Sequence, residues 1–153
     1  PPLRWVLLEG GAPIPSDALQ TGTEVDNEEL YSVRAWFKGG VHPGKAGEHL
    51  QDGRASISYG GLEHPVSTFE ILIGDSSYAR WIDVTSTVSE SLSQNRGPIY
   101  PIEAGREATG EPLFVAQAQY DMGWHPGKAA LHDDHCCVGY GGGEVWIRSF
   151  RIL

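Results

Sequence analysis

One stretch of the sequence occurs twice, as GTEVDNEELYSVRAWFKGGVHPGKA at positions 22–46 and as GREATGEPLFVAQAQYDMGWHPGKA at positions 105–129. The two copies are identical at 11 of 25 aligned positions, at an offset of 83 residues. Similarity at a period of tens of residues indicates one structural unit that is used twice. The sequence therefore predicts a fold made of two homologous halves.

Shorter motifs extend this repeat towards both ends of the chain. Arg4-Trp5-Val6 returns as Arg80-Trp81-Ile82, and residues 57–72 return as residues 138–153 at an offset of 81. The offset changes from 76 to 83 to 81, which places an insertion of seven residues near positions 86–96 of the second copy. Insertions of this kind belong in surface loops.

The composition predicts an all-β protein. The 153 residues include 20 Gly and 10 Pro, and the apolar runs are short and bounded by these residues, which is typical of brief strands. We expect two pseudo-symmetric antiparallel β repeats, over residues 1–78 and 79–153, that form one compact unit. Strands are expected near residues 3–8, 29–37, 55–60, 68–74, 79–84, 112–120, 136–141 and 144–153, and a loop over residues 85–98, which are rich in Ser and Thr.

Charge and hydropathy exclude several classes of partner. The chain has 11 Lys+Arg against 20 Asp+Glu, a net charge of -9, and no basic cluster that could neutralise phosphates, so nucleic acid is not an expected partner. No apolar run reaches the roughly 18 residues of a membrane helix, so membrane insertion is not expected. Cys136 and Cys137 are adjacent and are expected to point to opposite faces of a strand, so they are poorly placed to form a disulfide with each other. The cysteines therefore do not indicate whether the protein works in an oxidising or a reducing compartment.

Some repeated residues are ionisable, and a shared core or backbone path does not account for them. A solvated charge is free to change between duplicated copies, so its retention in both suggests a repeated role. The repeated ionisable pairs are Glu24/Glu107, His42/His125, Lys45/Lys128 and Glu63/Glu144.

The His-Pro-Gly-Lys segment is predicted to form a turn in both copies, because Pro fixes φ and Gly permits a positive φ. The lysine would then stand at an exposed junction between a loop and a strand. A glutamate precedes this lysine by 21 residues in each copy, and the strand between them is expected to bring the two charges together. Such a pair can donate to and accept from vicinal sugar hydroxyls. A surface salt bridge is the alternative.

The order of these motifs resembles the DM-nine repeat, which is also found in natterin-like proteins. The resemblance rests on the Trp-Val start, Gly-x-Glu-x-x-x-Glu-x-Leu-Tyr at 22–31, His-Pro-Gly-Lys at 42–45, Tyr-Gly-Gly-x-Glu at 59–63 and the closing Phe-Glu-Ile-Leu at 69–72. It covers nearly the whole chain, twice. Two-repeat members include mannose-specific invertebrate lectins that form homodimers.

This resemblance implies a mannose site in each repeat and a homodimer that binds mannose-containing glycans. The mannose contacts of those lectins include an acidic residue and the lysine. In this chain we expect the neighbouring histidine and backbone to support them. This chain has Glu where the family more often has Asp, which moves the carboxylate by one methylene. The expected sugar-binding residues are Glu24, His42, Gly44 and Lys45 in the first copy and Glu107, His125, Gly127 and Lys128 in the second.

No enzymatic activity, cofactor or metal is expected. The spacing within residues 132–137 fits no standard zinc pattern, and residues 39–45 lack the Ser or Thr that ends a phosphate loop. Glu63 and Glu144 occupy equivalent positions and are expected to hydrogen-bond a glycine-rich turn rather than to act as a glycosidase pair. The alternative function is a structural or interaction module related to natterin-like toxins, without a working sugar site.

Of the five tryptophans, two are expected in the core and one beside a pocket. Trp5 and Trp81 open equivalent strands, so core packing is their expected role. Trp36, Trp124 and Trp146 are not repeated, and among them Trp124, next to His125, is the one expected to line a pocket.

Overall fold

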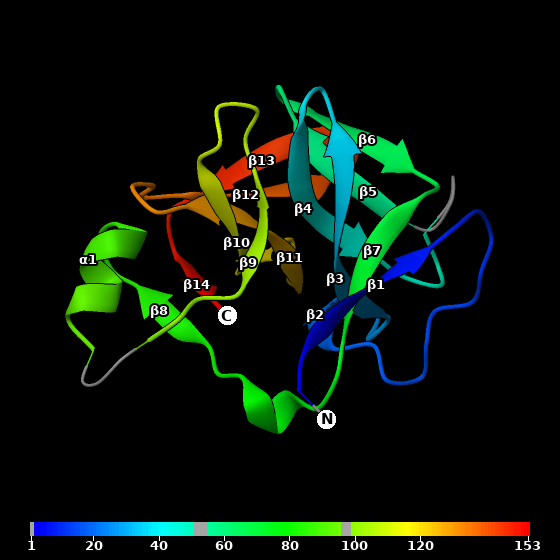
Figure 1. The fold of residues 1–153 in the computed structure, drawn as a ribbon, viewed down its shortest axis with the longest axis horizontal. Helices are drawn as coiled ribbons and strands as arrows, with labels where there is room; N and C mark the ends of the chain where they lie inside the picture. Colours follow the sequence, from blue (N-terminus) through cyan, green and yellow to red (C-terminus); the bar gives the residue numbers. More distant parts are fainter. Residues whose placement is uncertain (1, 51–54, 96–98) are drawn as a thin grey trace.

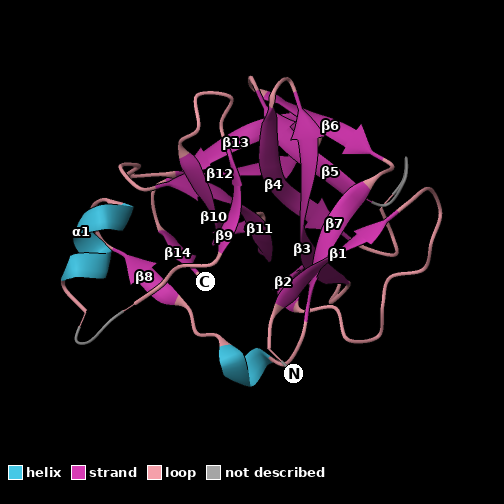
Figure 2. Ribbon diagram, viewed as in Figure 1, coloured by secondary structure: helices cyan, strands magenta, loops and turns pink. Residues whose placement is uncertain are grey.

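The computed structural model describes residues 2–50, 55–95 and 99–153, and these residues form one antiparallel sheet of 14 strands (Figures 1 and 2). The all-β prediction is confirmed. The first half contributes β1 (Arg4–Leu8), β2 (Gln20–Thr23), β3 (Glu29–Phe37), β4 (Gly40–Ala46), β5 (Ala55–Tyr59), β6 (Leu62–Val66) and β7 (Phe69–Ile73). The second contributes β8 (Ile82–Val84), β9 (Glu103–Arg106), β10 (Pro112–Tyr120), β11 (Gly123–Ala130), β12 (Cys136–Tyr140), β13 (Gly143–Ile147) and β14 (Phe150–Ile152).

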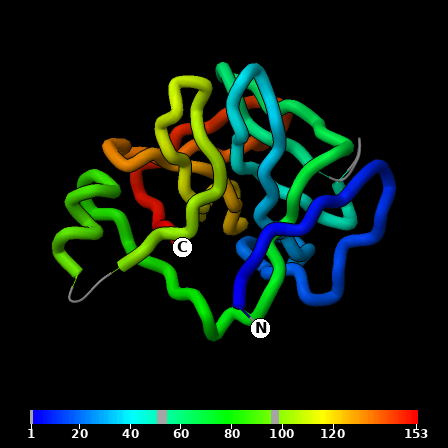
Figure 3. Tube along the Cα trace, viewed as in Figure 1, coloured from blue at the N-terminus to red at the C-terminus, as the bar shows by residue number. Residues whose placement is uncertain are grey.

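The strands repeat at the offsets that the sequence predicted. β2, β3 and β4 recur 83 residues later as β9, β10 and β11, and β5, β6 and β7 recur 81 residues later as β12, β13 and β14. The chain crosses between the halves through a 3-10 turn at Ser76–Tyr78, drawn in green along the lower edge of Figure 3. The division at residues 78 and 79 stays a prediction.

Several strands were missed from the sequence. β2, β4 and β6 of the first half and β9 and β11 of the second were not expected, and the strand predicted over 144–153 is two strands, β13 and β14. The loop predicted over 85–98 contains a helix, α1 (Val88–Ser93), while residues 96–98 lie outside the described residues. Thr87 caps this helix, because its side-chain oxygen accepts a hydrogen bond of 3.2 Å from the Glu90 N–H.

The predicted His-Pro-Gly-Lys turn is wrong, because the segment lies inside β4 and β11. On one side of β4, Val41 pairs with β9 and Gly44 pairs with β5, so Pro43 lies where the neighbouring strand changes. The N–H that proline lacks is therefore tolerated at this position. Gly44 is required because the backbone of β5 lies too close to leave room for a side chain, and not because the position has a positive φ. A Cβ on Gly44 would lie 2.0 Å from the Ser56 carbonyl oxygen, and one on Gly127 would lie 2.1 Å from that of Cys137.

The two halves interlock through two exchanged strands. β2 pairs with β3 of its own half and with β11 of the other, and β9 pairs equivalently with β10 and β4. Together with the β6–β13 pairing, these contacts close the sheet into a ring of eight strands, β2-β11-β12-β13-β6-β5-β4-β3. The lysine-bearing strands β4 and β11 therefore lie at the junction of the halves.

The core follows the same symmetry. One apolar cluster fills each half, and a third cluster joins residues of both halves: Leu19, Leu72, Ala104, Val115 and Leu153. Trp5 and Trp81 pack against this central cluster, as predicted. In the described part of the chain, no helix has both the length and the apolar character of a membrane span.

Candidate functional site

The two repeated lysines are buried, contrary to the exposed position expected for them. Lys45 is 4% exposed and Lys128 7% exposed, because each lies within a strand that is covered by the opposite half of the molecule. An ammonium group in such a place needs partners, since burial without them is costly. The partners of the two lysines define two equivalent polar sites.

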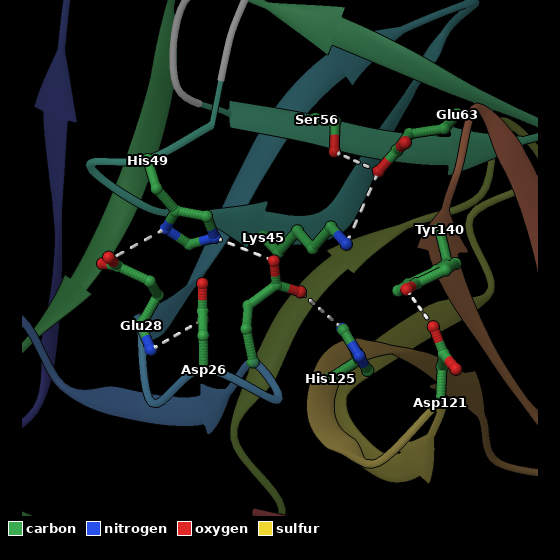
Figure 4. A network of polar contacts seen from close by, with 10 residues as sticks. Asp26, Glu28, Lys45, His49, Ser56, Glu63, Asp121, His125 and Tyr140 are labelled. Atoms are coloured by element: carbon green, nitrogen blue, oxygen red, sulfur yellow. Dashed lines mark hydrogen bonds and ion pairs between the residues drawn. The ribbon is translucent and has the colours of Figure 1, made fainter.

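At the first site, Lys45 forms an ion pair with Glu63, with 3.8 Å between Nζ and Oε2 (Figure 4). Ser56 donates a hydrogen bond of 2.8 Å to the same carboxylate oxygen. The ring of Tyr140, from the second half, lies 5.5 Å from Nζ, within the range of a cation–π contact. The first site thus combines a cation and an anion of one half with an aromatic wall from the other.

Glu24 lies at the same site but is held by histidines. Its Oε2 is 2.9 Å from Nε2 of His49, and its Oε1 is 3.7 Å from Nδ1 of His125. Burial lowers the pKa of Lys45, and the charges of Glu63 and Glu24 oppose that shift. The expected direct Glu24–Lys45 pair is therefore corrected: Glu63 is the ion-pair partner, and Glu24 acts on the lysine at longer range.

At the second site, Lys128 has closer partners. Its Nζ donates a hydrogen bond of 2.6 Å to the Ser58 carbonyl oxygen and lies 3.2 Å from Nδ1 of His42. The Glu144 carboxylate is 3.9 Å away, and the Tyr59 ring lies 5.5 Å from Nζ. The second site repeats the arrangement of the first with the roles of the two halves exchanged.

A cavity of about 250 Å³ opens at the second site. Glu107 and Lys128, the pair expected from the sequence, both line it, so the fold brings them to one place although the ion pair of Lys128 is with Glu144. The other lining residues are Tyr59, Gly60, Leu113, Asp133, His135, Cys137, Glu144 and Trp146. Residues with carboxylates, an ammonium group and aromatic rings thus line one open cavity.

His42 lies next to Lys128 and His125 near Lys45, and both histidines are neutral rings. Burial, followed by the charge of Lys128, lowers the pKa of His42 to about 4. Burial and the charge of Lys45 lower the pKa of His125 in the same way. Each ring also packs edge-on against a tyrosine, His42 against Tyr59 at 4.9 Å and His125 against Tyr140 at 5.1 Å between centroids.

Glu63 and Glu144 lock the two halves together, and their predicted bond to a glycine-rich turn is confirmed. Glu63 accepts a hydrogen bond of 3.1 Å from the Gly142 N–H, and Glu144 accepts one of 3.3 Å from the Gly61 N–H. Each turn belongs to the opposite half, which spacing within one copy could not show. The sequence also missed their ion pairs with the lysines and the role of the tyrosines, although the repeated Tyr-Gly-Gly-x-Glu motif contains both residue types.

Other predicted positions behave differently. Gly44 and Gly127 serve strand packing, as described above. Trp124 stacks on Arg151 at 4.6 Å and does not line the cavity, whereas Trp146 does. Within the described residues, no group of three or more His, Cys, Asp or Glu side chains has the arrangement of a metal site.

The family model of the DM9 repeat matches residues 2–53 and residues 33–147, so this chain belongs to the DM9 repeat family. No curated protein matches the sequence. Among solved structures, the chain is similar to the nematode sperm cell motility protein MFP2B, with a TM-score of 0.68 and 18% identity. The match covers 98% of this chain but 45% of MFP2B, so the chain spans less than half the length of that protein and shares its fold.

Proposed function

We propose that this protein binds sugars, and mannose-containing glycans in particular, at its two lysine-centred sites. The observation that carries the proposal is the cavity at the second site, where Glu107, Lys128 and Glu144 meet beside Tyr59. Small-ligand sites combine aromatic walls with a few convergent polar groups, and this cavity has that composition.

The chemistry of the site suits vicinal hydroxyl groups. One hydroxyl can donate to the Glu107 carboxylate while it or its neighbour accepts from the Lys128 ammonium group, and charge-assisted bonds are stronger than neutral ones. Glu144 and Ser58 hold the ammonium group in place, so little side-chain freedom is lost on binding. The protein acts as a binder and returns its ligand unchanged.

Two sites in one chain favour bridging between glycans. Weak affinity for a single sugar becomes avidity when two sites engage one surface, and a homodimer would double their number. We therefore propose that the protein works as a multivalent lectin.

A structural module without a working sugar site is the second candidate. The observation in its favour is that Lys128 already has three partners inside the protein, namely Ser58, His42 and Glu144. The fold is also shared with a protein described as a sperm cell motility protein.

A glycan array followed by calorimetry separates the two candidates. We expect binding to mannose-terminated glycans, and we expect Glu107→Gln to weaken it at the second site. Glu111→Gln is the matched control, because Glu111 is exposed at the other end of the same turn. Absence of binding to every glycan at high protein concentration would favour the structural module.

A further inference from the structure

The two sites differ along one row of residues that crosses three strands. Residues directly opposite each other in antiparallel strands point to the same face of the sheet. In the first half this row runs Lys45–Ser56–Pro65, and in the second half it runs Lys128–Cys137–Trp146. The lysine is common to both rows, whereas the far end is a proline in one and an indole ring in the other.

Trp146 forms a shelf at the rim of the second cavity. Its ring stacks on His135, with 4.3 Å between centroids and 13° between planes, and His135 is in turn 3.1 Å from the Asp134 carboxylate. Because Trp146 is nevertheless 67% exposed, much of its surface stays open to solvent. Such a ring is large, apolar and already oriented, which reduces the entropy lost on binding.

In the described part of the first site, the position equivalent to Trp146 carries no aromatic ring. Pro65 has no aromatic ring, and the Glu24 carboxylate is already bonded to His49 at 2.9 Å. The second cavity, by contrast, places Glu107, Lys128 and Trp146 around the same space. Its volume of about 250 Å³ is slightly below the ~300 Å³ at which pockets for drug-sized molecules begin.

We propose that the second site takes a saccharide of two linked rings, with the terminal pyranose between Lys128 and Glu107 and the next one stacked on Trp146. One face of a pyranose carries mainly C–H groups, so it packs on a flat aromatic surface while its hydroxyls point outwards. This assignment rests on the proposed sugar binding and adds a substrate preference to one of the two sites.

Calorimetry with methyl mannoside and an α-linked mannose disaccharide tests the assignment on the intact chain. We expect the wild type to bind the disaccharide about tenfold more tightly than the monosaccharide at one of its sites. Trp146→Ala should remove that tenfold difference, which equals ~1.4 kcal/mol. Trp146→Phe should keep most of the preference, because it retains an aromatic face.

Trp36→Ala is the matched control, since Trp36 is 75% exposed on β3 and lines no part of the cavity. It should change neither affinity. Equal binding of the two sugars by the wild type, or an unchanged preference in Trp146→Ala, would overturn the shelf while leaving sugar binding intact. Absence of binding to either sugar would overturn the proposed function and the shelf with it.

Discussion

Replacing Lys128 with methionine tests whether the buried ammonium group joins the two halves of the protein. Methionine has similar length but no charge, so Lys128→Met removes the hydrogen bond of 2.6 Å to the Ser58 carbonyl oxygen and the ion pair of 3.9 Å with Glu144. Both acceptors then stay buried without the donor. Loss of one partner of a buried ion pair costs about 3–5 kcal/mol, and the long Glu144 distance places our expectation near ~3 kcal/mol.

Urea denaturation at neutral pH measures this loss as a fall in the free energy of unfolding. Lys38→Met is the control, because Lys38 is exposed and its substitution should cost under ~0.5 kcal/mol. Glu144→Gln and the double variant complete a cycle in which the double variant should lose ~1–3 kcal/mol less than the sum of the single variants. A cost below about 1 kcal/mol for Lys128→Met would refute the proposed link between the halves, and strictly additive losses would refute a stabilising interaction between Lys128 and Glu144.

Three further outcomes are expected. Gly44→Ala should destabilise the fold by about 2 kcal/mol or more in thermal melts, because a Cβ at this position meets a backbone carbonyl. Gly10→Ala is the control and should not destabilise the fold, because the space around Gly10 is open. Equal melting temperatures of the two variants would contradict the packing argument. The pKa of His42, about 4, lies below its ordinary value of 6.5. As the pH falls, the unfolded chain therefore takes up a proton at His42 before the folded protein does. The free energy of unfolding should consequently drop by ~2–3 kcal/mol between pH 6.5 and 4. Urea titrations across this range should show a smaller drop for His42→Gln, and an identical pH dependence would count against the buried neutral ring. Glycan binding should survive exhaustive chelation, and its loss with recovery on adding calcium or zinc would contradict a metal-free site.

Much of the fold could be predicted because internal similarity preserves strand positions. The offsets of 83 and 81 residues place β9 to β14 correctly once β2 to β7 are known. β4 and β11 were missed because Pro and Gly inside them have the local signature of a turn. Their reasons are not local: Pro43 lies at an interruption of the ladder, and Gly44 is needed because β5 approaches too closely for a Cβ.

The candidate site was predictable in its residue types but not in its pairing. Retention of Lys45 and Glu24 in both copies pointed to residues that the fold brings to one polar site. The ring of Tyr140 over Lys45 depends on how the halves interlock, and one copy of the repeat holds no information about that contact. From the sequence, Glu63 was assigned only to a turn. Its ion pair with Lys45 was missed because the two residues come together through the pairing of β5 with both β4 and β6, and β4 and β6 were not predicted.

A crystal structure of the protein soaked or co-crystallised with mannose would show directly whether the second cavity binds a sugar. We expect a pyranose in this cavity, with hydroxyl oxygens at hydrogen-bond distance, ~2.7–3.2 Å, from the Glu107 carboxylate and from Nζ of Lys128. The same crystals grown from Glu107→Gln protein should show weaker or absent sugar density there. A cavity that stays free of sugar at saturating mannose, or a sugar bound only elsewhere, would contradict the assignment.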